Sequence, residues 1–138
     1  DAFIPDTYIS NEFQKLDIYK RIAGIENQSD YDDMLEELLD RFGEPTKAVL
    51  NLLAIAKMKA IAHQAYVTEM KQIGKEIKIT LYEKAKINPA GIPALMDKYR
   101  RRLQFKTDKE PKFIFLPQGK VVEALTEFAE ELQKLVEE

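Results

Sequence analysis

The sequence predicts an α+β domain in which helices pack on a small antiparallel four-stranded sheet. Apolar residues recur with helical spacing up to about residue 64, and segments that alternate between apolar and polar residues begin at residue 67. The predicted order is three helices, hairpin, helix, hairpin, helix, a segregation that is typical of α+β folds. The length is sufficient for a single domain, which we expect to span residues 1–138.

The N-terminal segment predicts an extended arm followed by a helix. A Pro-Asp turn signal follows a short apolar stretch, so we expect the arm of residues 1–9 to lie against the domain or against a parent chain. Ser10 is the expected N-cap of a helix over residues 11–23, and Gly24 is its expected end. Apolar residues at helical spacing predict the inward face of this helix: Phe13, Leu16, Tyr19, Ile22 and Ala23.

Two further helices are predicted before residue 67, where the spacing of apolar residues changes from helical to alternating. The second covers residues 30–42, with Ser29 as its N-cap and Gly43 as its stop. Its apolar stripe has the clearest helical period in the chain and consists of Tyr31, Met34, Leu35, Leu38, Leu39 and Phe42. The third helix runs from about residue 46 to residue 64. It is apolar nearly all the way round, which indicates burial on several sides.

The second half of the chain predicts two hairpins and two helices. The hairpins are formed by residues 67–73 with 76–82 and by residues 103–107 with 112–116. Between them, Asn88 and Pro89 predict the N-cap and first turn of a short helix that ends near Tyr99. A last amphipathic helix is predicted over residues 119–136.

The composition excludes several classes of chemistry. The chain has no Cys and one His, His63, which excludes a disulfide scaffold, a Cys nucleophile and a metal site built from Cys or several His. It has no glycine-rich loop of the kind that binds phosphates and no apolar run of about 20 residues. The chain starts with Asp1 and not with Met, so we expect it to be a piece of a longer protein. The absence of Cys is consistent with a cytoplasmic location.

Charge is distributed unevenly, and the predicted helix over residues 30–42 is the most acidic element. The first 46 residues hold 12 acidic and 4 basic side chains, although the net charge of the whole chain is only -3. Opposite the apolar stripe lie Asp33, Glu36, Glu37 and Asp40, with Glu37 and Arg41 spaced for a favourable pair. Such a face is either simply solvated or a docking surface for an Arg-bearing partner, because carboxylates at this spacing suit Arg side chains.

A basic segment follows the predicted short helix. It contains Lys98, Arg100, Arg101, Arg102 and Lys106, with Tyr99 and Phe105 between them. Cations interleaved with aromatic rings are typical of single-stranded nucleic-acid binding. The alternative is a solvated helix end, or cations that pair with carboxylates of the same domain.

Four phrases of the sequence together resemble one protein family. They are Phe-Ile-Pro-Asp-Thr-Tyr-Ile at residues 3–9, Leu-Asp-Ile-Tyr-Lys-Arg-Ile-Ala at 16–23, Glu-Leu-Leu-Asp-Arg-Phe-Gly at 37–43, and Asn-Leu-Leu with Ile-Ala within 51–56. This succession resembles the C-terminal domain of the bacterial transcription-repair coupling factors, the Mfd family. The resemblance runs along the whole chain in order and is strongest over residues 3–63.

The resemblance implies a regulatory role without an active site. Members of the family are large ATP-driven DNA translocases that remove stalled RNA polymerase and recruit the excision-repair protein UvrA. ATP and magnesium are expected in the motor domains of the parent protein, and no cofactor or metal is expected in this domain. The domain is expected to dock on the N-terminal UvrB-like module of the same parent chain, where it masks the UvrA-binding surface and restrains the motor.

The resemblance also indicates which residues face that module. Glu37 and Asp40 match the acidic positions of the family motif, and Arg41 matches it too. Asp33 and Glu36 are the secondary candidates on the same face. UvrA, RNA polymerase and DNA would be partners through the parent, in the cytoplasm, with no membrane involved. The alternative hypothesis is an accessory domain that contacts nucleic acid through the basic segment of residues 98–112.

Overall fold

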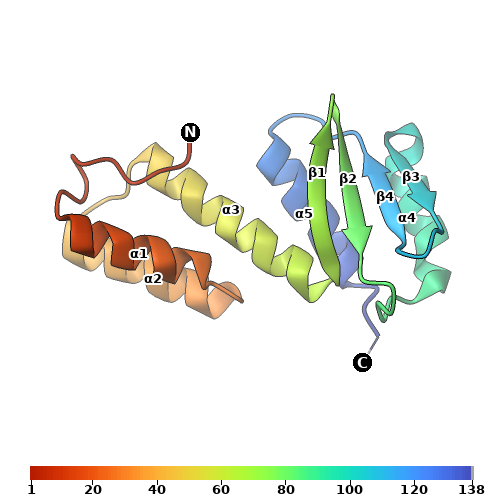
Figure 1. Ribbon diagram of the computed structural model, residues 1–138, viewed down its shortest axis with the longest axis horizontal. Helices are drawn as coiled ribbons and strands as arrows, with labels where there is room; N and C mark the ends of the chain where they lie inside the picture. Colours follow the sequence, from red (N-terminus) through yellow and green to blue (C-terminus); the bar gives the residue numbers. More distant parts are fainter. Residues whose placement is uncertain (138) are drawn as a thin grey trace. The chain divides into compact units, whose positions relative to one another are not determined.

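The computed structural model describes residues 1–137, which form five α-helices and one four-stranded sheet (Figure 1). The helices are α1 (Glu12–Ala23), α2 (Gln28–Phe42), α3 (Lys47–Gln64), α4 (Ile92–Tyr99) and α5 (Val121–Gln133). The strands are β1 (Val67–Ile73), β2 (Glu76–Leu81), β3 (Leu103–Lys106) and β4 (Lys112–Phe115). Short 3-10 turns at Pro89–Gly91 and Arg100–Arg102 precede and follow α4. The predicted α+β class and the order of elements are confirmed.

The chain divides into two compact units. Unit 1 comprises Asp1–Ala60, and unit 2 begins at Ile61, so the boundary falls within α3. The assignment of the whole chain to a single domain stays a prediction. Each unit has a hydrophobic core of its own.

The caps of α1 and α2 differ from those predicted. Asn11, and not Ser10, caps α1, because its side-chain oxygen accepts a hydrogen bond from Gln14 N at 3.0 Å. Asn27, and not Ser29, caps α2, and it accepts from Asp30 N at 2.8 Å. Asn caps helices as well as Ser does, so the residue types alone do not decide between neighbouring candidates. The predicted stops at the two glycines that follow these helices are confirmed.

The core of unit 1 joins the N-terminal arm to three helices. Its buried apolar residues are Ile4 and Ile9 of the arm, Ile18, Ile22 and Ile25, Met34 and Leu38 of α2, and Val49 and Leu53 of α3. Hydrogen bonds also hold the arm in place. Ile4 N donates to the Tyr19 hydroxyl at 2.7 Å, and the Tyr8 hydroxyl donates to Gly43 O at 2.8 Å. The prediction that the arm lies against the domain is confirmed.

The predicted inward face of α1 is wrong at two positions. Phe13 is 87% exposed and Leu16 is 54% exposed, whereas Ile18 and Ile22 are buried. The helix carries two apolar stripes with helical spacing, and spacing alone does not determine which stripe meets the core. Ile18 and Ile22 pack inward, which leaves Phe13 and Leu16 in solvent.

Unit 2 is built on a fully antiparallel sheet with strand order β1-β2-β4-β3. The register pairs Ile77 with Phe115 and Ile79 with Phe113, which places all four side chains on one face. Phe128 of α5 packs on this face, with ring centroids 5.3 Å from Phe113 and 5.1 Å from Phe115. The helix α5 therefore covers this face of the sheet (Figure 1).

The last helix is shorter than predicted at both ends. Gly119 has a φ of +73°, a left-handed conformation that lies just before the helix start. After Gln133 the chain pairs with the segment before α4. Asn88 N donates to Leu135 O at 2.8 Å, Glu137 N donates to Lys86 O at 2.7 Å, and Ile87 forms a bridge with Val136. These long-range bonds take the place of the final helical turn. The helical spacing of apolar residues does not predict where such pairing ends a helix. The prediction that Asn88 caps the short helix is confirmed only for its first turn. The Asn88 side chain accepts from Ala90 N at 3.0 Å and caps the 3-10 turn Pro89–Gly91, whereas α4 begins at Ile92 without a side-chain cap.

Candidate docking surface

Glu37 lies at the junction of α1 and α2 and is held by two arginines. Both Nη atoms of Arg21 on α1 donate to the two carboxylate oxygens of Glu37. Arg41, one turn further along α2, donates from Nη1 to Oε2 of Glu37 at 2.7 Å. Arg21 also lies 3.9 Å from the carboxylate of Asp17. A chain of ion pairs, Asp17–Arg21–Glu37–Arg41, therefore connects the two helices.

This arrangement keeps Glu37 ionised. The hydrogen bonds from Arg21, and secondarily those from Arg41, lower the pKa of Glu37 to about 2 from its usual 4.5. A bidentate Arg–carboxylate pair also fixes the orientation of both planar groups. Glu37 is thus a fixed part of the unit 1 scaffold and remains negative over the whole neutral range.

The remaining carboxylates of this face are unpaired. Asp33, Glu36 and Asp40 form no hydrogen bond or ion pair with any residue that the structure describes. Together with Glu37 and Leu39 they line a shallow depression on α2. Leu39 is 45% exposed, although its position in the apolar stripe predicts a buried side chain. We call Asp33, Glu36, Glu37, Leu39 and Asp40 the acidic face.

The predicted docking residues therefore lie together, but their chemical roles differ. The spacing correctly brings Glu37 and Asp40 onto one surface with the two secondary candidates, and the Glu37–Arg41 pair is confirmed. Sequence reasoning missed Arg21. Its contact with Glu37 spans 16 residues and depends on how two helices pack, and no local spacing signals such a contact.

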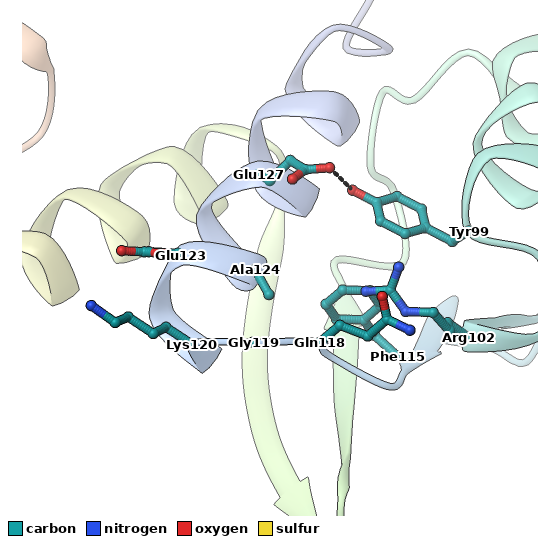
Figure 2. A pocket seen from close by; sticks show the side chains of 9 residues that line it. All are labelled: Tyr99, Arg102, Phe115, Gln118, Gly119, Lys120, Glu123, Ala124 and Glu127. Carbon is teal, nitrogen blue, oxygen red and sulfur yellow. Dashed lines mark hydrogen bonds between the residues drawn. The ribbon is translucent and has the colours of Figure 1, made fainter.

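A second hollow of about 270 Å³ lies in unit 2, between α4, β4 and α5 (Figure 2). On its wall, the Tyr99 hydroxyl donates to Glu127 Oε1 at 3.3 Å, and burial raises the pKa of Tyr99. The guanidinium of Arg102 lies 5.5 Å from the Tyr99 ring centroid and 5.6 Å from that of Phe115. Arg102 Nε donates to the carbonyl of Leu116 at 3.1 Å. This hydrogen bond and the two ring contacts hold the Arg102 side chain against Tyr99 and Phe115.

The basic segment is only partly available to a partner. Lys98 lies 3.4 Å from Glu127 and 3.4 Å from Glu131, and Arg102 is stacked as described above. Tyr99 is buried, and Phe105 is half-buried with its ring centroid 4.8 Å from that of Phe113. Both interleaved aromatic rings therefore serve the core of unit 2. The cations of residues 98–112 that remain exposed, with no ion pair to any described residue, are Arg100, Arg101, Lys106 and Lys109.

Within residues 1–137, no cluster of three or more His, Cys, Asp or Glu side chains is placed to hold a metal ion. No helix in that range has the length and apolar character needed to cross a membrane. His63 is exposed in the last turn of α3.

The fold defines an α+β domain of a class known from a solved structure. The crystal structure of the C-terminal domain of transcription-repair coupling factor matches 98% of this chain and 88% of its own chain, with a TM-score of 0.82 and 29% identity. The model of the TRCF domain family matches residues 1–92. The chain belongs to this family, as its four sequence phrases predict.

Curated relatives carry the same name. The chain is 38% identical over 85 residues to the transcription-repair-coupling factor of Bacillus subtilis (strain 168), covering 62% of this chain and 7% of that protein. The protein of Staphylococcus haemolyticus (strain JCSC1435) is 39% identical over 85 residues, with the same coverage. That of Staphylococcus aureus (strain USA300) is 38% identical over 91 residues, covering 66% of this chain and 8% of that protein. The chain thus spans a small part of the relatives that it matches.

Proposed function

We propose that this chain is a non-catalytic docking domain of a transcription-repair coupling factor. In this proposal it binds the N-terminal UvrB-like module of the parent protein, masks the UvrA-binding surface there and restrains the DNA translocase motor. The observation that carries the proposal is the acidic face. Its Asp33, Glu36 and Asp40 have no partner among residues 1–137, while Glu37 is held in place. Fixed carboxylates at helical spacing suit the planar forks of Arg side chains.

The residues of the face have separate roles in this proposal. Asp40 is the primary group for a cation of the module, and Asp33 and Glu36 extend the contact along α2. Glu37 acts mainly as a structural residue that links α1 to α2, because its two oxygens already accept three hydrogen bonds. Arg41, held by its hydrogen bond to Glu37, adds one positive charge to the docking surface.

The parent protein supplies the chemistry in this proposal. The chain covers only 7% of the Bacillus subtilis relative. We assign ATP, magnesium and DNA to the parent's other domains in this proposal. The domain itself binds no cofactor and acts as a releasable latch in the cytoplasm. Engagement of RNA polymerase or DNA by the parent opens the latch and exposes the surface for UvrA. A latch must be reversible, so its interface is expected to be worth only a few kcal/mol.

Calorimetric titration of this chain with the purified N-terminal module of its parent tests the proposal. The variant Asp33→Asn, Glu36→Gln, Asp40→Asn keeps the shapes of the three side chains and removes their charges. We expect it to bind at least about tenfold more weakly, with a weaker dependence on salt. Glu123→Gln, an exposed carboxylate of α5, is the matched control and should bind like the wild type. Unchanged affinity of the triple variant contradicts the proposal.

The second candidate function is an accessory contact with nucleic acid through the basic segment. Arg100, Arg101 and Lys106 are exposed and unpaired among the described residues, as an accessory nucleic-acid contact requires. A gel-shift assay of the chain with duplex and single-stranded DNA at low salt distinguishes the two functions. Binding that is lost in Arg100→Ala, Arg101→Ala supports the accessory role, and no binding at low salt eliminates it.

A further inference from the structure

Unit 1 exposes an apolar pair on α1 that its own core does not use. Phe13 is 87% exposed and Leu16 is 54% exposed. They are three residues apart on one helix, so their side chains are neighbours on its surface. The core side of α1 is already occupied by Ile18 and Ile22. The fold of unit 1 therefore does not account for this exposed Phe and Leu.

A row of side chains on α1 leads from Phe13 to the acidic face. Phe13 lies one helical turn before Asp17, and Asp17 begins the ion-pair chain through Arg21 to Glu37 on α2. Glu37 is itself a member of the acidic face. These side chains connect Phe13 on α1 with Glu37 on α2, and Leu16 lies beside Phe13.

Charge restricts the kind of partner that fits this surface. Three of the four basic residues before residue 47 are engaged within unit 1. Lys15 pairs with Asp6, and Arg21 and Arg41 both pair with Glu37. Three carboxylates of the acidic face, Asp33, Glu36 and Asp40, have no cation beside them in the part of the chain that the structure describes. A complementary surface therefore offers Arg or Lys side chains beside an apolar pocket.

We infer that Phe13 and Leu16 form the apolar anchor of the docking surface. In the complex, the Phe13 ring inserts into an apolar pocket of the UvrB-like module that is bordered by cations, and those cations meet Asp33, Glu36 and Asp40. This inference rests on the proposed function. It adds that Phe13 and Leu16 supply most of the affinity of the chain for the module. Buried aromatic anchors provide most of the binding energy in many interfaces, and the charges around them set partner choice and association rate.

The test compares the anchor with the carboxylates in the same titration. In the 138-residue chain, Phe13→Ala with Leu16→Ala is expected to weaken binding to the N-terminal module at least about tenfold. Its salt dependence should remain that of the wild type, because no charge is lost. Leu50→Ala, which removes a 42% exposed leucine of α3 in the same unit, is the control and should bind normally. Thermal unfolding should confirm that both variants fold, since the deleted side chains lie in solvent.

Each result separates the two proposals. If the Asp33→Asn, Glu36→Gln, Asp40→Asn variant loses affinity and the anchor variant does not, docking stands and the anchor is refuted. If neither variant weakens binding, or the wild type does not bind the module, both proposals fail. Sedimentation of the chain alone tests whether a second copy of the chain, and not the module, covers Phe13 and Leu16. A wild-type dimer that Phe13→Ala, Leu16→Ala converts to a monomer shows that a second copy covers the pair, and it overturns the inference.

Discussion

Arg21 of α1 grips the carboxylate of Glu37 on α2 with both Nη atoms, and this contact links the two helices that carry the docking surface. Figure 1 shows the two helices side by side. Because Arg41 also donates to Glu37, the carboxylate is a structural element as well as a member of the acidic face. Substitutions on this face therefore have to be separated into those that change the scaffold and those that change only the free charges.

Substitutions of Glu37 and Asp40 should differ in their effect on stability. Glu37→Ala removes three hydrogen bonds between side chains and should lower the free energy of unfolding by about 1 kcal/mol. Asp40→Ala removes a group that has no partner among the described residues and should change it by less than about 0.5 kcal/mol. Urea unfolding followed by circular dichroism measures both. Equal destabilisation by the two variants would show that the Arg21–Glu37 contact contributes nothing to stability.

The second prediction is a pH dependence with a defined sign. The pKa of Glu37 is about 2 in the folded protein, below its usual 4.5, so its ion pairs stabilise the fold fully above the usual value. That contribution is lost as the pH falls from 4.5 towards 2. Because the site is near the surface, we expect the loss to be about 1 kcal/mol. Glu37→Gln should have a smaller free energy of unfolding than the wild type at neutral pH. This difference should vanish as the pH approaches 2, where Glu37 is protonated in the folded protein. A difference that stays constant with pH contradicts this account.

The third prediction tests whether the arm belongs to the core. Ile9 is 1% exposed, and Ile9→Ala should destabilise unit 1 by about 2 to 5 kcal/mol through the lost packing and the cavity that remains. Phe13→Ala removes a larger side chain only four residues away, yet it should change stability by less than about 0.5 kcal/mol. Chemical denaturation of the two variants provides the comparison. A larger effect at Phe13 than at Ile9 would refute the described orientation of α1.

The fourth prediction concerns the aromatic core of unit 2. The Phe128 ring lies between Phe113, Phe115 and Tyr99, at centroid distances of 5.3, 5.1 and 5.7 Å. Phe128→Ala should destabilise unit 2 by about 3 to 5 kcal/mol. Val121→Ala on the same helix should have little effect, because Val121 is 42% exposed. Amide hydrogen exchange in β2 and β4 reports the loss, and unchanged protection in Phe128→Ala would show that this ring does not hold α5 to the sheet.

Local sequence signals predicted the elements well and the contacts between elements poorly. Alternation and turn residues located both hairpins, and i, i+3 and i, i+4 spacing placed Asp33, Glu36, Glu37 and Asp40 on one face. The choice of Ile18 over Phe13 as a core residue depends on what packs against α1, which no local pattern encodes. The Arg21–Glu37 contact and the pairing of residue 87 with residue 136 went unpredicted for the same reason.

The N-terminal arm has a consequence for synthesis on the ribosome. The core of unit 1 draws on Ile4 at its beginning and on Leu53 near its end. Translation delivers these residues in order, so Ile4 and Ile9 emerge before the α3 side chains that help to bury them. The nascent arm, α1 and α2 therefore expose apolar surface until α3 leaves the exit tunnel, and only then does the unit close.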